Sequence, residues 1–163
     1  MKKLALALAL CSFGVAAEEA PIYGNVQSKC VITTDTPGVY GNPVPYQLST
    51  DISSGGIPPV LRYDVLAANN YKAVITTPVD FSSAPPLEDV VNWTGSVEVS
   101  EVTDAAMSGY DAAKRIYNNV TEFDLTVAGT VWFKATSIAD YGYEKSLPAG
   151  EYNAVVEAEC IAL

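Results

Sequence analysis

Apolar and polar residues alternate along most of the chain, which is the pattern of half-buried β-strands. Near the start, small and apolar residues take the even positions from Ile22 to Ile32, with polar residues between them. Near the end, a second alternating run places five residues on one face: Tyr152, Ala154, Val156, Ala158 and Cys160. We expect both runs to be strands, with Cys30 and Cys160 facing the interior.

Further runs of strand composition lie between these two. We expect strands at 60–67, 71–76, 95–102, 120–127 and 129–136. A weaker strand at 44–48 belongs at a sheet edge or bulge, because the prolines at 43 and 45 cannot donate backbone hydrogen bonds. The glycine at 129 predicts a hairpin between the last two strands, 120–127 and 129–136.

One segment departs from the alternation. Within 103–118, Thr103 is a possible helix N-cap, Asp104 lies in the first turn, and Lys114 and Arg115 lie near the end, which predicts a short helix. Clusters of glycine, proline, asparagine and serine separate the other runs and predict turns. Seven or eight short strands with regular turns predict an all-β fold, an antiparallel β-sandwich.

The first residues resemble an export signal. Two lysines precede an apolar run at 4–10, and small residues follow as far as Ala17. This order predicts a signal peptide at 1–17 and a single β-sandwich domain at 18–163. The apolar run is far shorter than the roughly 20 residues that span a bilayer, so we expect no transmembrane anchor. Lipid attachment at Cys11 is the alternative, although Leu10 stands where a lipoprotein signal has a small residue.

Cleavage after Ala17 leaves two cysteines in the mature chain. In an oxidising compartment an even pair predicts a disulfide, here between Cys30 and Cys160; two buried free thiols are the alternative. Removing Lys2 and Lys3 from the formal charge of −10 gives −12. So acidic a chain offers no basic patch for nucleic acid or for an anionic membrane surface. We expect a secreted or cell-surface protein that is exported via the periplasm.

The composition argues against catalysis. The chain has no histidine, which excludes Ser-His-Asp and Cys-His nucleophiles and histidine-bound zinc. Paired carboxylates, as in glycosidases, are the remaining catalytic option. The candidate pairs are Glu88 with Asp89, Glu98 with Glu101, and Glu157 with Glu159. Solvation explains each of them in so acidic a chain, and we expect a protein that is not an enzyme.

Ligand-binding patterns are sparse as well. Asp35 and Asp51 stand alone in turns and lack the ligand density of a calcium loop. We expect no cofactor and no metal. Ten tyrosines could stack on sugars, but tyrosine is also an ordinary strand residue that packs its ring and solvates its hydroxyl. The tyrosines considered for a sugar site are Tyr110, Tyr117, Tyr141 and Tyr143.

The two ends of the chain resemble the chaperone–usher pilins and the spore-coat-U-type subunits. The opening run from Ile22 to Ile32 has their apolar residue, glycine, alternating valines and cysteine. The stretch from Leu147 to Val156 is similar to their closing-strand motif. The resemblance implies an immunoglobulin-like sandwich that lacks its last strand, which a neighbouring subunit donates. The candidate strand-addition face is Ala20, Ile22, Gly24 and Val26.

Two departures from that family keep a self-complete fold open as an alternative. Few mature residues precede Cys30, so one segment would have to serve as both donor and first strand. A bridge between the first and last strands could also hold the acceptor groove closed.

The sequence therefore leaves two functions to weigh. One is a structural subunit of an extracellular filament, pilus-like appendage or surface assembly; its partners would be copies of itself or related subunits, and a periplasmic chaperone. The other is a monomeric module that binds carbohydrate or a surface protein.

Overall fold

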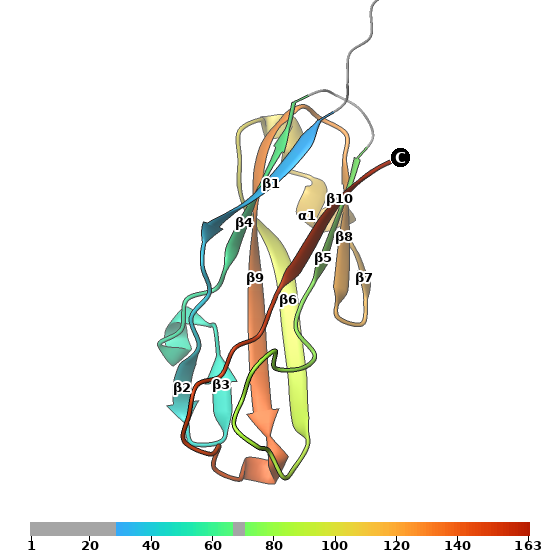
Figure 1. Cartoon of the computed structure of the whole chain (residues 1–163). Coiled ribbons are helices and arrows are strands. Elements are labelled where there is room, and N and C mark those ends of the chain that lie inside the picture. The colour runs from blue at the N-terminus through green and yellow to red at the C-terminus, as the bar shows by residue number, and fades with distance from the viewer. Residues whose placement is uncertain (1–28, 67–70) are drawn as a thin grey trace, which may run out of the picture.

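Two antiparallel sheets face each other in the computed structural model, which describes residues 29–66 and 71–163 (Figure 1). The strands of these residues are β1 Cys30–Thr36, β2 Gly41–Val44, β3 Gln47–Ser49, β4 Val60–Val65, β5 Tyr71–Thr76, β6 Val91–Val102, β7 Arg115–Tyr117, β8 Val120–Leu125, β9 Gly129–Tyr141 and β10 Glu157–Ala162. Four short helical segments accompany them: η1 Ile52–Ser54, η2 Ala105–Met107, α1 Tyr110–Ala113 and η3 Gly142–Glu144.

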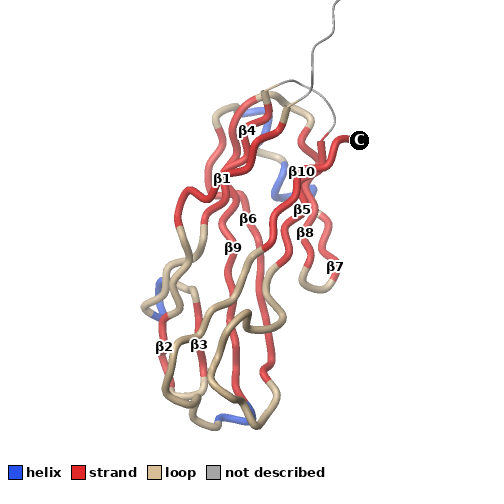
Figure 2. The backbone as a smooth tube through the Cα atoms, viewed as in Figure 1, coloured by secondary structure: helices blue, strands red, loops and turns tan. Residues whose placement is uncertain are grey.

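The larger sheet is organised around the 13-residue strand β9. Strand β6 pairs along one side of β9, and β4 and then β3 pair along the other. Strand β1 flanks β4, and β2 flanks β3. The smaller sheet has the order β10-β5-β8-β7 and covers the half of the larger sheet that holds β1 and β4 (Figure 2). We call this half upper, and the end at η3 lower, as in Figure 1.

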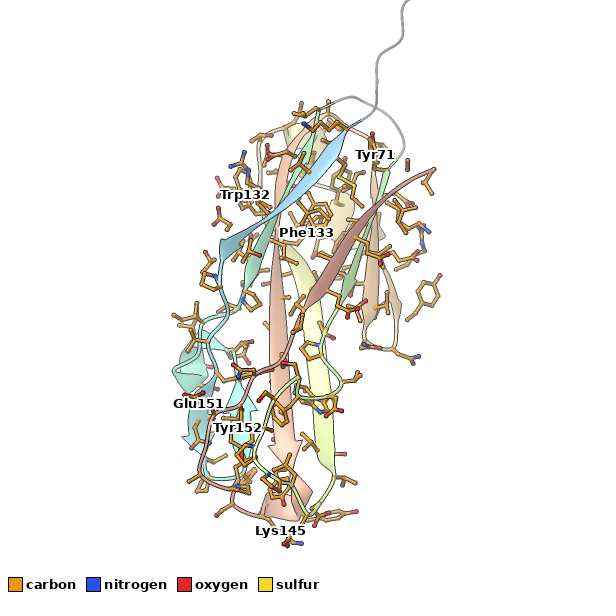
Figure 3. All side chains as sticks on the ribbon, in the orientation of Figure 1. Tyr71, Trp132, Phe133, Lys145, Glu151 and Tyr152 are labelled. Atoms are coloured by element: carbon orange, nitrogen blue, oxygen red, sulfur yellow. A yellow bond between two sulfur atoms is a disulfide. The ribbon has the colours of Figure 1, made fainter. Side chains whose placement is uncertain are left out.

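Alternating side chains of both sheets form the core in the upper half. Phe133 of β9 is fully buried; its ring lies 5.2 Å from that of Tyr63 and 4.3 Å from that of Phe123, measured between centroids. Fully burying a side chain of this size stabilises a fold by about 1.5–3 kcal/mol. Strand alternation therefore supplies the main apolar contact between the sheets (Figure 3).

Loops rather than strands cover the lower half of the larger sheet. The ring of Phe81 lies 4.7 Å from that of Trp93 on β6 and 5.1 Å from that of Tyr152. A single antiparallel bridge between Ser83 and Asn153 joins the two covering segments. The stretch before β10 thus lies over the sheet without belonging to either ladder.

The structure confirms the predicted all-β sandwich and the two inward-facing cysteines, which pack against the core. The described residues hold ten strands rather than seven or eight, because 41–49 and 115–117 contribute short ones. The predicted strands at 95–102 and 129–136 are longer, since β6 begins at Val91 and β9 ends at Tyr141. The predicted first strand is described only from Cys30, and it continues to Thr36.

The predicted hairpin at Gly129 is wrong. Strand β8 pairs with β5 and β7, whereas β9 pairs with β3, β4 and β6, so the chain crosses between the sheets here. Both strands bury alternate residues in the same core, and alternation alone does not distinguish a hairpin from a crossover. Gly129 has a φ of 147°, and an added Cβ would lie 2.6 Å from the Cε of Met107.

The predicted strand at 44–48 is interrupted, because Val44 ends β2, a turn occupies 45–46 and β3 begins at Gln47. The predicted sheet-edge position agrees with β2. Proline at 45 lies in that turn, and proline at 43 lies in the sheet-edge strand β2, where no donor is needed.

The helix predicted at 103–118 forms only in part. Asp104, not Thr103, caps η2 by accepting a hydrogen bond from the Ala106 amide at 2.8 Å. Four residues form α1, and Arg115–Tyr117 then form β7 because they pair with β8.

Within 29–66 and 71–163, none of the helices has the length and apolar character needed to cross a membrane.

Candidate strand-addition groove

Strands β1 and β10 are open edges of different sheets on the same side of the molecule (Figure 1). In the part of the chain that the structure describes, β1 pairs only with β4 and β10 only with β5. Each strand therefore presents a free row of backbone donors and acceptors, to which another strand can bind.

A disulfide joins the two edges near the upper end. Cys30 and Cys160 are bonded, with their Cα atoms 6.4 Å apart and 130 positions apart in sequence, as the alternation predicted. The first and last strands are not ladder neighbours, so the bond ties one sheet to the other. The Tyr63 hydroxyl donates to the Glu159 carbonyl at 3.2 Å from the opposite sheet, and burial raises the pKa of this phenol.

Below the disulfide the two edge segments enclose a groove of about 470 Å³, which we call the edge groove. Its floor includes Leu61, Thr50 and Ser137 from the inner face of the larger sheet. One rim is the stretch 37–39 that follows β1, and the other is the stretch 154–156 that precedes β10. Leu61 is only 6% exposed, so the groove reaches the hydrophobic core.

The rims carry unused backbone groups. Between the Ser83–Asn153 bridge and the start of β10, residues 154–156 join no ladder within the described chain. On the other rim, Val39 pairs with Ile57, and Pro37 and Gly38 belong to no strand. The burial of 152–156 nevertheless alternates as in a strand. The groove thus has room and hydrogen-bonding capacity for an extended peptide.

The edge groove is uncharged. None of its lining residues is Asp, Glu, Lys or Arg, although the whole chain has a formal charge of −10. Its polar lining includes a hydroxyl pair, in which Tyr40 Oη and Ser137 Oγ lie 2.9 Å apart. Burial raises the pKa of Tyr40, against the smaller opposing effect of the Ser137 hydrogen bond. The groove suits a neutral, largely apolar occupant.

Part of the β6 edge, on the opposite side of the sandwich, is covered. The free edge of β6 meets the connection to β7, where Asp111 accepts from the Val99 amide at 3.2 Å and Lys114 donates to the Val97 carbonyl at 2.9 Å. Asp111 and Lys114 also pair with each other at 3.1 Å. These contacts occupy two of the backbone groups that a strand added at β6 would need. Sequence reasoning missed this pair, because it assigned Lys114 to a helix end.

The candidate carboxylates lie on the surface or in ion pairs. Glu98 binds Lys134 across the larger sheet, and Asp89 binds Lys145, so that the pKa of Asp89 is lowered. Glu157 and Glu159 lie on the exposed face of β10, and Glu101 is exposed on β6. The Glu88 amide donates to the hydroxyl of Tyr141. Each acid thus has a solvated or structural setting.

The isolated aspartates of the sequence stay apart. Asp35 accepts a weak hydrogen bond from the Trp132 indole at 3.4 Å, and Asp51 precedes η1. Among the described residues, no three acidic or sulfur-bearing side chains gather as a metal site would require.

The four tyrosines considered for a sugar site are dispersed. The buried Tyr110 accepts from the amides of Thr126 and Val127, and the buried Tyr141 accepts from Glu88. Tyr117 and Tyr143 are exposed, on β7 and in η3 respectively. They form no common platform.

Three predictions fall on residues outside the described ranges. They are the predicted signal peptide at 1–17, the alternative of lipid attachment at Cys11, and the candidate strand-addition face Ala20, Ile22, Gly24 and Val26. The rims of the edge groove were not predicted. A partial signal was present, because the alternation of 152–160 continues ahead of β10 without a pairing partner.

No protein-family model matches the chain, and neither a curated protein nor a solved structure matches it.

Proposed function

We propose that this protein is an exported, non-catalytic structural subunit that joins copies of itself by strand addition into an extracellular filament, pilus-like appendage or surface assembly. The observation that carries the proposal is the uncharged edge groove between two open sheet edges. The disulfide and the resemblance of the two chain ends to pilins and spore-coat-U-type subunits support it.

Strand addition fits the groove physically. An extended donor hydrogen-bonds along a free edge and places every second side chain in the groove. Residues 154–156 already alternate as a strand does, and Leu61 and Val156 offer apolar surface between the sheets. A neutral groove also accepts an apolar donor without desolvating a charge.

The donor we propose is the face Ala20, Ile22, Gly24 and Val26 of a second copy. The described ladder between β1 and β4 runs over Cys30–Thr36, and the proposed donor face precedes it in the sequence. Because these four residues occupy alternate positions, an extended strand would place their apolar side chains on one face, as an occupant of the groove requires. An exposed donor and groove would also explain a need for a periplasmic chaperone before assembly.

The disulfide is compatible with this use of the groove. It joins β1 and β10 at their upper ends, whereas Thr34, Pro37 and Val155 line the groove farther down. The bond therefore limits how far a donor extends upward and leaves the lower part free.

A mixing experiment tests the proposal. The donor variant Ile22→Asp keeps an intact groove, and Ala154→Trp fills the groove while keeping the donor. We expect the full mature chain to form polymers that resist denaturant, each variant alone to stay monomeric, and an equal mixture to give one-to-one dimers. Ala112→Trp, exposed on α1, is the matched control and should polymerise. Monomeric wild-type protein at high concentration would refute the proposal.

A monomeric binding module is the second candidate, since the Tyr40–Ser137 hydroxyl pair and the apolar rims would also suit a neutral sugar. Glycan binding by wild-type monomer that is lost in Ala154→Trp, without polymers, would favour this reading.

A further inference from the structure

The turn after β9 holds an exposed aromatic side chain in an unfavourable backbone conformation. Gly142, Tyr143 and Glu144 have φ values of 32°, 43° and 66° in succession. Residues with a Cβ rarely adopt this left-handed region. Tyr143 is nonetheless 87% exposed, the highest value among the exposed large hydrophobic residues that the structure describes. Such strain at an exposed residue points to a function.

Backbone hydrogen bonds hold this turn. The Gly142 amide donates to the Val90 carbonyl at 2.9 Å, and the Lys145 amide donates to the Gly142 carbonyl at 2.9 Å. The Lys145 ammonium pairs with Asp89, beside which Gly142 passes so closely that an added Cβ would lie 2.8 Å from the Asp89 Cβ. Figure 3 shows Lys145 at the lower end of the molecule. Tyr143 is therefore presented on a fixed base, and aromatic anchors of this kind dominate many interfaces.

The upper end offers a complementary surface. Leu66 is 65% exposed and lies beside Lys29, to whose carbonyl its amide donates at 3.0 Å. Lys29 is exposed, and so is Glu144 at the lower end; neither forms an ion pair in the described chain. Leu66 with Lys29 at one end, and Tyr143 with Glu144 at the other, thus each combine an exposed apolar side chain with a charge that has no described ion pair, and the two charges are of opposite sign.

We propose that Tyr143 and Glu144 of one copy dock on Leu66 and Lys29 of the next. This contact rests on the proposed strand addition. With Ala20 to Val26 in the groove of an acceptor, only two residues separate the donor strand from Lys29. At about 3.3 Å per residue, they hold the upper end of the donor copy within about 10 Å of the acceptor groove. Because the disulfide joins the two edges above the groove, we expect the donor chain to leave the groove at its lower end, which places the donor's upper end against the acceptor's lower half.

Photo-crosslinking of the assembled full mature chain tests the contact. With p-benzoylphenylalanine in place of Tyr143, we expect crosslinks between copies that map to the peptides holding Lys29 or Leu66. The same probe in place of Tyr117, exposed on β7, should give none there. Polymers without the expected crosslink from position 143 would overturn the docking contact and leave strand addition intact. Failure of the unsubstituted chain to polymerise would overturn both.

Tyr143→Asn provides a second measurement, because asparagine tolerates a positive φ. We expect its polymers to form with about tenfold weaker apparent affinity, as for loss of an interface anchor, and Tyr117→Asn to match the wild type. Unchanged affinity of Tyr143→Asn would contradict the proposal. A synthetic peptide of residues 18–28 should bind the groove of the monomeric Ile22→Asp protein equally well with and without Tyr143→Asn, which separates the two contacts.

Discussion

Charged side chains outside the edge groove are largely paired. Every described cation after Lys29 forms an ion pair with a nearby carboxylate: Arg62, Lys72, Lys114, Arg115, Lys134 and Lys145. The excess acids remain on the surface, where they keep a strongly charged protein in solution. In this strongly acidic protein, none of the residues that line the edge groove is Asp, Glu, Lys or Arg.

The Arg115–Asp124 pair gives a pH-dependent prediction. Arg115 donates two hydrogen bonds to the carboxylate, at 2.7 and 2.9 Å, and lowers the pKa of Asp124 below its ordinary value of 3.8. A lowered folded-state pKa stabilises the fold above the unfolded-state value, and this gain is lost as the pH falls through the folded-state pKa. In the monomeric Ile22→Asp background, Asp124→Asn should be less stable than the unchanged background at pH 7, and the difference should shrink as the pH falls below 3.8.

Urea unfolding from pH 7 to pH 2 measures this difference. A deficit that stays constant over the whole range would contradict the assignment, because it would have to arise from something other than ionisation.

The disulfide gives a stability prediction. Its loop of 130 positions is long, and removing a native disulfide from a small secreted domain lowers the free energy of unfolding by about 2–5 kcal/mol. We expect a loss of this size in urea unfolding when Cys30→Ala and Cys160→Ala are both introduced into the monomeric Ile22→Asp protein. Reductant should destabilise the protein that keeps the disulfide by a similar amount and leave the cysteine-free protein unchanged. Equal stability of the two proteins would show that the bond contributes nothing to folding.

At the scale of elements, the sequence predicted the strands well and their pairing poorly. Alternation places residues on a buried or exposed face, which is why the inward cysteines and most strand positions agree with the structure. The sheet that a strand joins depends on long-range contacts, such as those of β9 with both β4 and β6. Alternation at 120–136 is the same for a hairpin and for a crossover.

The candidate site was predictable to a similar extent. The two terminal strands and their disulfide follow from the sequence. The rims of the edge groove could not be predicted from the sequence. Residues 37–39 have the composition of a turn, and they form a wall of the groove only because they lie opposite 154–156. The cover of the β6 edge depends on the side chains of Asp111 and Lys114, whose spacing is also that of an ordinary helix pair.

That cover gives a prediction for the β6 edge. Removing both side chains, with Asp111→Ala and Lys114→Ala, exposes the Val99 amide and the Val97 carbonyl. We expect a loss of about 1–2 kcal/mol in urea unfolding, as for hydrogen bonds to charged groups. We also expect new association through the uncovered edge when polymerisation at the edge groove is blocked by Ala154→Trp.

Analytical ultracentrifugation detects this association. Glu101→Ala, an exposed change on the same strand, is the control and should remain monomeric in the Ala154→Trp background. A monomeric double variant of unchanged stability would mean that the two side chains do not protect the edge.

At the scale of the whole molecule, the two sides of the sandwich differ in kind. On one side the connection from β6 to β7 covers part of the β6 edge, and the other side is held by a single covalent bond above an open groove. The proposed donor face and the edge groove are different surfaces of each copy, so strand addition would join the copies head to tail. This asymmetry is the physical basis of the proposed head-to-tail growth.

Strand addition at the edge groove can be tested by amide hydrogen exchange at residues 154–156. In the Ile22→Asp monomer these backbone amides join no ladder, and we expect them to exchange rapidly. In wild-type polymer a donated strand would bond to this rim, and the same amides should become strongly protected while those of β6 stay unchanged. Polymers in which residues 154–156 exchange as fast as in the monomer would contradict strand addition at the edge groove.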